Sequence, residues 1–201
     1  REDEVGSVNQ TAYSKLVGEF VNDAARLVED AWDWSALRTT LTVTTSANIF
    51  NYVLTNSGNR GKILDIVNDT SNFFIKYKDQ HWFNNAFLNQ DPPKGSPQYF
   101  TYNGVDANGD TQVDLYPIPN GVYTLRFNMV LRSPEMSADT DQLIIPALPV
   151  IHMAVALATR ERGESGGAST PELFASANNM LSDAIALDAS KHPEETTFMA
   201  V

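Results

Sequence analysis

Three histidines, His81, His152 and His192, are the side chains of this sequence best suited to general acid–base chemistry. His81 follows Asp79 in a segment that also contains Trp82, and this pair is the basis of one hypothesis, a hydrolase. No serine, aspartate or second histidine stands at the spacing of a recognisable catalytic triad. His152 lies within an apolar run, which favours a packed or interface histidine, and His192 lies at an expected helix end, where it complements the dipole. We therefore expect the protein not to be an enzyme.

A cluster of acidic and amide residues matches part of a calcium-binding loop. Positions one, three, five and nine of such a loop are taken by Asp106, Asn108, Asp110 and Asp114. The glycine falls at the fourth position instead of the sixth, and Pro117 stands at the twelfth, where a bidentate glutamate is needed. The geometry of a hairpin turn explains the same residues. We expect a turn here, with no metal and no cofactor.

Motifs that are absent from the sequence exclude further kinds of chemistry. The chain has no cysteine, which excludes disulfides, thiolate metal sites and cysteine nucleophiles. It contains neither a nucleophile elbow nor a dinucleotide-binding fingerprint. Residues 163–167 are rich in glycine, but they follow an expected helix and lack the lysine of a phosphate-binding loop. We expect a linker there.

The net charge of −11, from 14 basic and 25 acidic residues, argues against nucleic-acid binding by charge neutralisation. The charge is unevenly spread along the chain. Residues 1–33 carry 3 basic and 8 acidic side chains (net −5), residues 34–133 carry 8 and 7 (net +1), residues 134–162 carry 2 and 4 (net −2), and residues 163–201 carry 1 and 6 (net −5). Two interpretations stay open: the acid serves solubility, or the two ends meet and form an acidic face.

The size and composition suit a soluble core. The 201 residues are enough for one domain or two small ones, and 42% hydrophobic with 19% charged residues excludes wholesale disorder. No apolar run approaches the ~20 residues of a membrane span, and no signal peptide opens the chain, so we expect no membrane association. The chain begins at Arg1 rather than at a methionine, and we expect that N-terminal sequence is missing from it.

Apolar residues three and four positions apart predict a long amphipathic helix at the start of the chain. Its stripe contains Tyr13, Leu16, Val17, Phe20, Val21, Ala24, Leu27, Val28 and Ala31. Ser7 or Asn9 is expected to cap its start, and the helix ends near the two indoles of Trp32 and Trp34. Two indoles so close cannot share one stripe, so we expect one of them to pack under the next element.

Short β-branched and aromatic runs between turn residues predict a β-rich middle segment. The expected strands are residues 39–45, 49–54, 62–67, 73–77, 98–103, 111–116 and 122–131, with a short helix at residues 79–89. The first two strands are expected to form a hairpin across residues 46–48. Residues 91–97 contain three prolines and are expected to hold no regular element. The last strand is expected to place Tyr123, Leu125, Phe127 and Met129 on one face.

Two more helices are expected in the C-terminal part of the chain. Residues 150–159 are apolar almost all round, which predicts a helix that other elements surround, with Pro146 and Pro149 bracketing its start. Thr170 is expected to cap the last helix. The stripe of that helix contains Leu173, Ala177, Met180, Leu181, Ala184 and Leu187. Pro193 ends the pattern.

This order of elements predicts an α+β fold. A single amphipathic helix cannot bury its stripe alone. We therefore expect the first helix to pack on the last two in an antiparallel helical bundle, with a large antiparallel β-rich insertion between helix 1 and the C-terminal helices. The expected domains are residues 1–35 and 147–192 for the bundle, residues 36–146 for the insertion, and residues 193–201 for an extended tail.

Several short segments occur in a characteristic order along most of the chain. They are Trp32-Asp33-Trp34-Ser35-Ala36-Leu37, Leu115-Tyr116-Pro117-Ile118-Pro119-Asn120-Gly121-Val122-Tyr123-Thr124-Leu125-Arg126-Phe127, Ser133-Pro134, Asp139-Thr140-Asp141-Gln142-Leu143-Ile144-Ile145-Pro146, and the helix end at Arg162-Gly163. In this order and spacing the chain resembles the head-to-tail adaptor (connector) proteins of tailed bacteriophages, of the tail tubular protein A type found in short-tailed phages.

The resemblance implies a non-enzymatic structural protein of the virion, located at the head–tail interface and assembled in the host cytoplasm. Members of the family form a dodecameric ring beneath the portal protein and connect it to the nozzle or next tail component. The ring surrounds the DNA ejection channel. The implied partners are the portal protein, the next tail component, neighbouring copies of the chain in a homo-oligomeric ring, and passing double-stranded DNA without sequence-specific binding. A ring of acidic subunits would repel DNA phosphates and let the genome slide through.

The resemblance also implies a docking segment, because the C-terminal segment of family members reaches up to the portal. The candidate portal-docking tail consists of Glu194, Glu195, Thr196, Thr197, Phe198, Met199, Ala200 and Val201. Apolar side chains beyond two glutamates suit an extended peptide that a partner orders. A frayed terminus is the alternative interpretation.

A second function stays open because the middle segment is dense in aromatic residues. Rings such as Phe74, Trp82 and Tyr99 could stack on sugars, as in a carbohydrate- or surface-binding β module of a phage tail. The near-neutral charge and alternating placement of these residues favour a sheet core instead.

Overall fold

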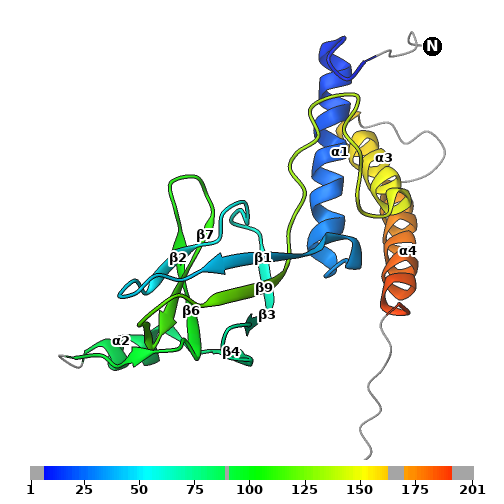
Figure 1. Cartoon of the computed structure of the whole chain (residues 1–201). Helices are drawn as coiled ribbons and strands as arrows, with labels where there is room; N and C mark the ends of the chain where they lie inside the picture. The colour runs from blue at the N-terminus through cyan, green and yellow to red at the C-terminus, as the bar shows by residue number, and fades with distance from the viewer. Residues whose placement is uncertain (1–6, 89–90, 163–169, 192–201) are drawn as a thin grey trace, which may run out of the picture. The chain divides into compact units, whose positions relative to one another are not determined.

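The chain folds into two compact units. The computed structural model describes residues 7–88, 91–162 and 170–191. One unit, called the helical unit below, joins Arg1–Leu37 to Ser133–Val201, and the other, called the β unit, is the continuous segment Arg38–Arg132 (Figure 1). The expected mixed α+β fold is confirmed. Residues 133–146, which we expected in the insertion, belong to the helical unit.

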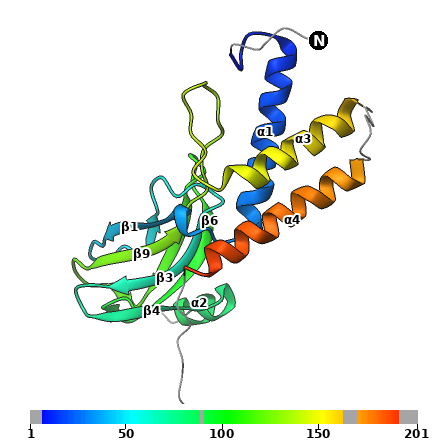
Figure 2. The same cartoon turned by 90° about the vertical axis from the view of Figure 1, so that its right-hand side faces the viewer.

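Among its described residues, the helical unit has three long helices. These are α1 (Ala12–Ala31), α3 (Ala147–Arg162) and α4 (Thr170–Ala189), with a short 3₁₀ turn, η1 (Ser35–Leu37), after α1. α3 packs against both α1 and α4 (Figure 2). Ala24, Val28, Ala156 and Ala177 have no exposed surface, so small side chains fill much of the space between these helices.

The start of α1 differs from the expected one. The N-cap is Thr11 rather than Ser7 or Asn9. The backbone N–H of Ser14 donates to Thr11 Oγ1 (3.0 Å), and the Thr11 N–H donates to Ser14 Oγ (2.9 Å). This reciprocal capping box satisfies donors that the first turn of a helix leaves unpaired. The sequence hides it because serine stands where glutamate or glutamine is usual.

The described part of the β unit contains nine strands and one helix. They are β1 (Arg38–Thr44), β2 (Asn51–Val53), β3 (Lys62–Asn68), β4 (Phe73–Tyr77), α2 (Gln80–Phe87), β5 (Lys94–Gly95), β6 (Tyr99–Val105), β7 (Thr111–Tyr116), β8 (Ile118–Pro119) and β9 (Thr124–Val130). Seven strands form one sheet in the order β1-β9-β3-β4-β6-β7-β2, and β5 pairs with β8 in a second, two-stranded sheet.

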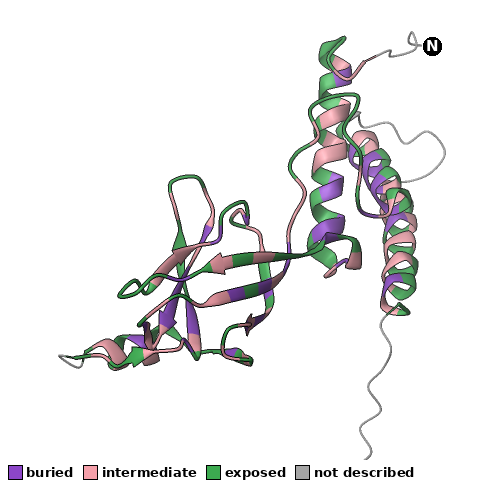
Figure 3. Ribbon diagram, in the orientation of Figure 1, coloured by how far each residue is buried: buried purple, intermediate pink, exposed green. Residues whose placement is uncertain are grey.

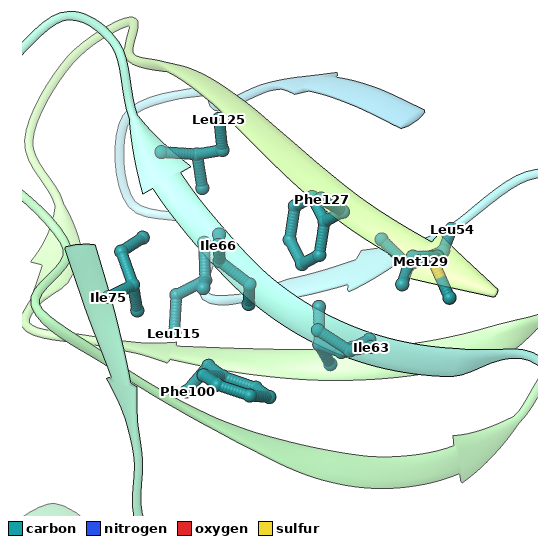
Figure 4. Packing of buried hydrophobic residues seen from close by; sticks show 10 residues of the cluster. Leu54, Ile63, Ile66, Ile75, Phe100, Leu115, Leu125, Phe127 and Met129 are labelled. Atoms are coloured by element: carbon teal, nitrogen blue, oxygen red, sulfur yellow. The ribbon is translucent and has the colours of Figure 1, made fainter. Parts of the chain in front are cut away.

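The core of the β unit lies inside this sheet, which curls around it (Figure 4). Leu125, Phe127 and Met129 of β9 are fully buried, which confirms the predicted alternation of the last long strand. Tyr123 is half-buried against the same cluster. Strands β3, β4, β6 and β7 contribute the rest of the cluster together with Leu54, which follows β2. The core therefore depends on segments that are distant in sequence.

Strand pairing departs from the expected pattern in three places. The prediction that the first two strands form a hairpin was wrong, since β1 pairs with β9 and β2 pairs with β7. The side chains of Leu41 and Val43 in β1 pack on the core beside β9. β4 and β6 run parallel, so the insertion is not wholly antiparallel; α2 carries the chain back between them. The proline-rich stretch does hold a strand, β5, since two residues suffice to pair with β8.

α3 begins earlier than expected, at Ala147. Pro149 therefore lies in its first turn, where a missing N–H costs no intrahelical hydrogen bond. The strands at residues 62–67, 73–77, 98–103 and 111–116 match β3, β4, β6 and β7 within a few residues. The expected linker after α3 lies outside the described residues.

Candidate partner-binding surface

One side of α3 remains exposed although its sequence is apolar. Val150 and Ala156 are buried against neighbouring helices, as expected. Leu148, Ile151 and Val155 are 54%, 56% and 48% exposed, and their spacing places them along one line of the helix. Figure 3 shows this mixture of buried and exposed residues on α3. The prediction that other elements surround this helix was therefore wrong for the isolated chain.

An apolar groove of 380 Å³ lies beside this exposed line. It runs between α1 and α3 and is lined by Tyr13, Val17 and Phe20 on one side and by Ile151, Val155 and Thr159 on the other. α3 carries no charged residue from Ala147 to Thr159. The groove and the exposed line together form what we call the α3 face, defined by Leu148, Ile151, Val155 and the groove residues.

A second apolar groove, of 470 Å³, lies between α1 and the segment that precedes α3, and both line it. Asn22 holds this segment at two points, because its side-chain amide donates to the Met136 carbonyl (2.9 Å) and accepts from the Met136 N–H (3.0 Å). Asp139 accepts from the Val8 N–H (2.8 Å), and this bond lowers the pKa of the Asp139 carboxyl. A Cβ on Gly18 would lie 2.8 Å from Val8, so glycine permits the close approach.

Asp188 connects α4 to the segment that follows α1. Its carboxylate is buried and accepts hydrogen bonds from Ser35 Oγ (2.5 Å), Ser35 N–H (2.9 Å), Trp32 Nε1 (3.0 Å) and Lys191 Nζ (2.9 Å). Burial raises the pKa of Asp188, but the bonds from Ser35, Lys191 and Trp32 outweigh it and hold the pKa far below its usual range. The other indole, Trp34, is buried and donates to the Val28 carbonyl (2.8 Å), which confirms that one indole packs inside.

Exposed acidic side chains occur on the two helices that pack against α3. Glu19, Asp23 and Asp30 of α1 are exposed, as are Glu172 and Asp183 of α4. The helical unit thus combines an uncharged apolar strip on α3 with exposed acids on α1 and α4. An exposed apolar strip is the pattern of an interaction surface rather than of a catalytic pocket.

The His81 pair has a structural explanation. Asp79 is the N-cap of α2 and accepts from the Trp82 N–H (2.8 Å). His81 is exposed, and its Nε2 lies 3.2 Å from the side-chain amide of Asn85 one turn along the helix. Asp79 and His81, the two residues of the hydrolase hypothesis, therefore each make a local contact within α2 and are not hydrogen-bonded to each other in the structure. His152 is half-buried, and His192 lies outside the described residues.

The calcium-like cluster forms a turn, as expected. Asp106 Oδ1 accepts from the N–H groups of Asn108 (2.8 Å) and Asp110 (2.9 Å), and Gly109 has a positive φ of 86°. The Asp110 carboxylate instead accepts from the N–H groups of Asn56 and Gly58. Among the described residues, no group of three or more histidine and acidic side chains is placed to hold a metal ion.

The aromatic residues of the β unit fall into two groups. Trp82 packs against Tyr99 (5.0 Å between ring centroids) and Tyr116 (5.2 Å), with the ammonium of Lys78 over two of these rings. These rings pack on one another, which agrees with the prediction that the aromatic residues pack inside the β unit. Phe74 and Tyr77 are 65% and 56% exposed, so the prediction of a packed core does not hold for these two residues.

The portal-docking tail, residues 194–201, lies outside the described residues, so its position stays a prediction. None of the described helices is long and apolar enough to cross a membrane. The exposure of Leu148, Ile151 and Val155 was missed because the sequence shows that a helix is apolar but not which other helices the chain supplies to cover it.

Comparison with known proteins decides the family. The model of the SU10 adaptor protein family matches residues 3–196, nearly the whole chain. The chain belongs to the SU10 adaptor protein family. This membership supports a structural adaptor of a bacteriophage and thus confirms the adaptor resemblance at that level. A search of the curated proteins finds no match. As a member of an adaptor family, the chain is expected to act by contact with portal and tail components, and the α3 face is an exposed apolar surface suited to such a contact.

Proposed function

We propose that the chain is the head-to-tail adaptor of a short-tailed phage, of the tail tubular protein A type. In this role it is a non-enzymatic ring subunit beneath the portal that connects it to the nozzle or next tail component. The family match over residues 3–196 is the observation that carries the proposal. Its location is the head–tail interface of the virion, after assembly in the host cytoplasm.

The α3 face is the proposed contact between neighbouring copies in the ring. Copies with a net charge of −11 repel one another, so a stable contact needs a strip without like charges. Leu148, Ile151 and Val155 provide such a strip, and charged residues are depleted at the centre of protein interfaces. In the proposed ring the first helix and the last two form an antiparallel bundle, and the β unit, Arg38–Arg132, forms the insertion.

The exposed acidic side chains of the helical unit suit the proposed DNA channel. Exposed acids such as Glu19, Asp23 and Asp183 in a dodecameric ring would give an anionic wall. An anionic wall repels phosphates, so double-stranded DNA passes without sequence-specific binding. The proposed docking tail, residues 194–201, supplies the portal contact through its apolar anchors.

The test is assembly with the portal of the same phage, followed by negative-stain imaging and light scattering. The wild-type chain is expected to add a ring to the portal. The double variant I151D/V155D places charges at the proposed copy-to-copy contact and is expected to lose the ring while its helical circular dichroism stays unchanged. V122D, at an apolar residue of the β unit that is even more exposed, is the control and is expected to assemble.

A deletion of residues 194–201 tests the tail separately. The shortened chain is expected to fold, because none of the described buried residues is removed, and to lose affinity for the portal. Undiminished docking would contradict the tail assignment. Absence of any ring in the wild-type mixture would contradict the proposed function as a whole.

A further inference from the structure

The first strand of the large sheet has an open edge. β1 stands at one end of the strand order, and no described strand other than β9 pairs with it. Its seven residues pair with β9 without a bulge, and they include no proline and only one charged residue, Arg38. Native proteins usually protect edge strands with bulges, prolines or charges. A regular edge without such protection is suited to pairing with another strand.

The hydrogen bonds show which backbone groups of β1 face outward. The Thr45 N–H donates to the Tyr123 carbonyl (2.9 Å). In an antiparallel ladder every second residue is hydrogen-bonded to the same neighbouring strand. The backbone N–H and C=O groups of the odd-numbered residues of β1 therefore point toward β9. On the other side of β9, the Asp69 N–H donates to the Thr124 carbonyl (2.9 Å). The backbone groups of the even-numbered residues of β9 therefore point toward β3 and not toward β1. The N–H and C=O groups that point away from the sheet are therefore those of Arg38, Thr40, Thr42 and Thr44.

We propose that β1 pairs with β1 of a second copy, antiparallel about a two-fold axis at Leu41. The opposite end of the sheet, β2, is a poorer partner because it is three residues long. A second β1 has the same length and alternation. This pairing sets Thr40 opposite Thr42 of the second copy and Arg38 opposite Thr44, so every outward-facing residue meets another one.

The chemistry of this register is self-complementary. Four residue pairs exchange two backbone hydrogen bonds each, and opposed threonines are favourable cross-strand neighbours. No charge stands opposite a like charge, because Arg38 is the only charged residue of the strand. The half-buried side chain of Leu41 packs against the core and would meet its counterpart at the axis.

This dimer is a state of the free chain. A two-fold contact relates copies that point in opposite directions, whereas a ring beneath a portal requires all copies to point the same way. The β1 pair therefore covers the open edge before assembly and separates when the chain enters the virion.

The experiment is sedimentation velocity of the full chain over a wide dilution series. The wild type is expected to show a reversible monomer–dimer equilibrium. In T40K/T42K each new lysine faces a lysine of the second copy, and the dimer dissociation constant is expected to rise about tenfold or more. In T40K/T42E each lysine faces a glutamate, and dimerisation is expected to return. T40K/T42E also restores the net charge of the wild type, and residue 42 lies opposite Arg126 of β9 within the same copy. The site-resolved hydrogen exchange of the β1 amides therefore assigns the effect to the strand pairing.

Hydrogen exchange gives a second measurement that does not need a variant. The amides of Thr40, Thr42 and Thr44 are expected to become protected as concentration rises, while those of Leu41 and Val43 are protected throughout. A wild type that stays monomeric, or a T40K/T42K chain that dimerises as the wild type does, would overturn the proposal. Neither result would affect ring assembly on the portal, so the proposed function is judged separately.

Discussion

Replacing Asp188 by asparagine should destabilise the helical unit by about 2–4 kcal/mol at neutral pH. One carboxylate oxygen accepts from Ser35 Oγ and Lys191, and the other accepts from Trp32 Nε1 and the Ser35 N–H. An asparagine amide keeps only one oxygen, so two donors lose their acceptor. Bonds to a charged group contribute about 1.5–3 kcal/mol each, and the half-exposed Lys191 contributes less because water screens it.

The pH dependence gives the sharper test. The pKa of Asp188 is lowered in the folded protein, so its contribution is fully present above the unfolded-state pKa of about 4 and is lost as the pH falls below it. The difference between wild type and D188N should therefore be constant from pH 7 down to about pH 5 and shrink below about pH 4. Urea unfolding followed by helical circular dichroism measures it.

The matched control is D183N, an exposed aspartate on the same helix. It removes the same charge without a buried network and is expected to change stability by less than about 0.5 kcal/mol. A D188N chain as stable as D183N at neutral pH, or a D188N deficit that persists undiminished in acid, would refute the assignment of Asp188 as the connection between α4 and the α1 end.

Two further predictions concern the β unit. F127A removes a fully buried ring from the curled sheet and should cost about 3–5 kcal/mol, measured by denaturant unfolding, with exposed V122A as its control; a cost near zero would contradict the core assignment. D110A leaves the N–H groups of Asn56 and Gly58 without their acceptor and should lower the free energy of unfolding by about 1–3 kcal/mol. Calcium or a chelator should leave the melting temperature of the wild type unchanged, because the Asp106 carboxylate already caps the turn. A calcium-dependent rise in that temperature would restore the metal hypothesis.

The local elements were largely predictable from the sequence because they depend on neighbouring residues. Alternation in β9 identified its buried face, and Asp79 lies where a cap was needed for α2. Strand partners were not predictable in the same way. The pattern of Leu41 and Val43 shows a half-buried strand but is equally compatible with a local hairpin and with pairing to β9, eighty and more residues away.

The candidate surface shows the same limit. The apolar composition of α3 was evident, yet exposure depends on which helices cover it, and that is a property of the assembled fold. Asp188 gave no sequence signal at all, since its partners Trp32 and Ser35 lie more than 150 residues earlier. Leu187, expected in the apolar stripe of α4, is 70% exposed because the helix turns Asp188 inward beside it.

The division of the chain has a consequence for its synthesis. The β unit is one uninterrupted stretch, so every strand assigned to it is synthesised before residue 133 is added. α1 is translated before the β unit but has no α3 to pack on until the whole β unit has been made. During that interval its apolar side remains open to water and to chaperones, so the order of translation favours a nascent chain whose middle matures before its beginning.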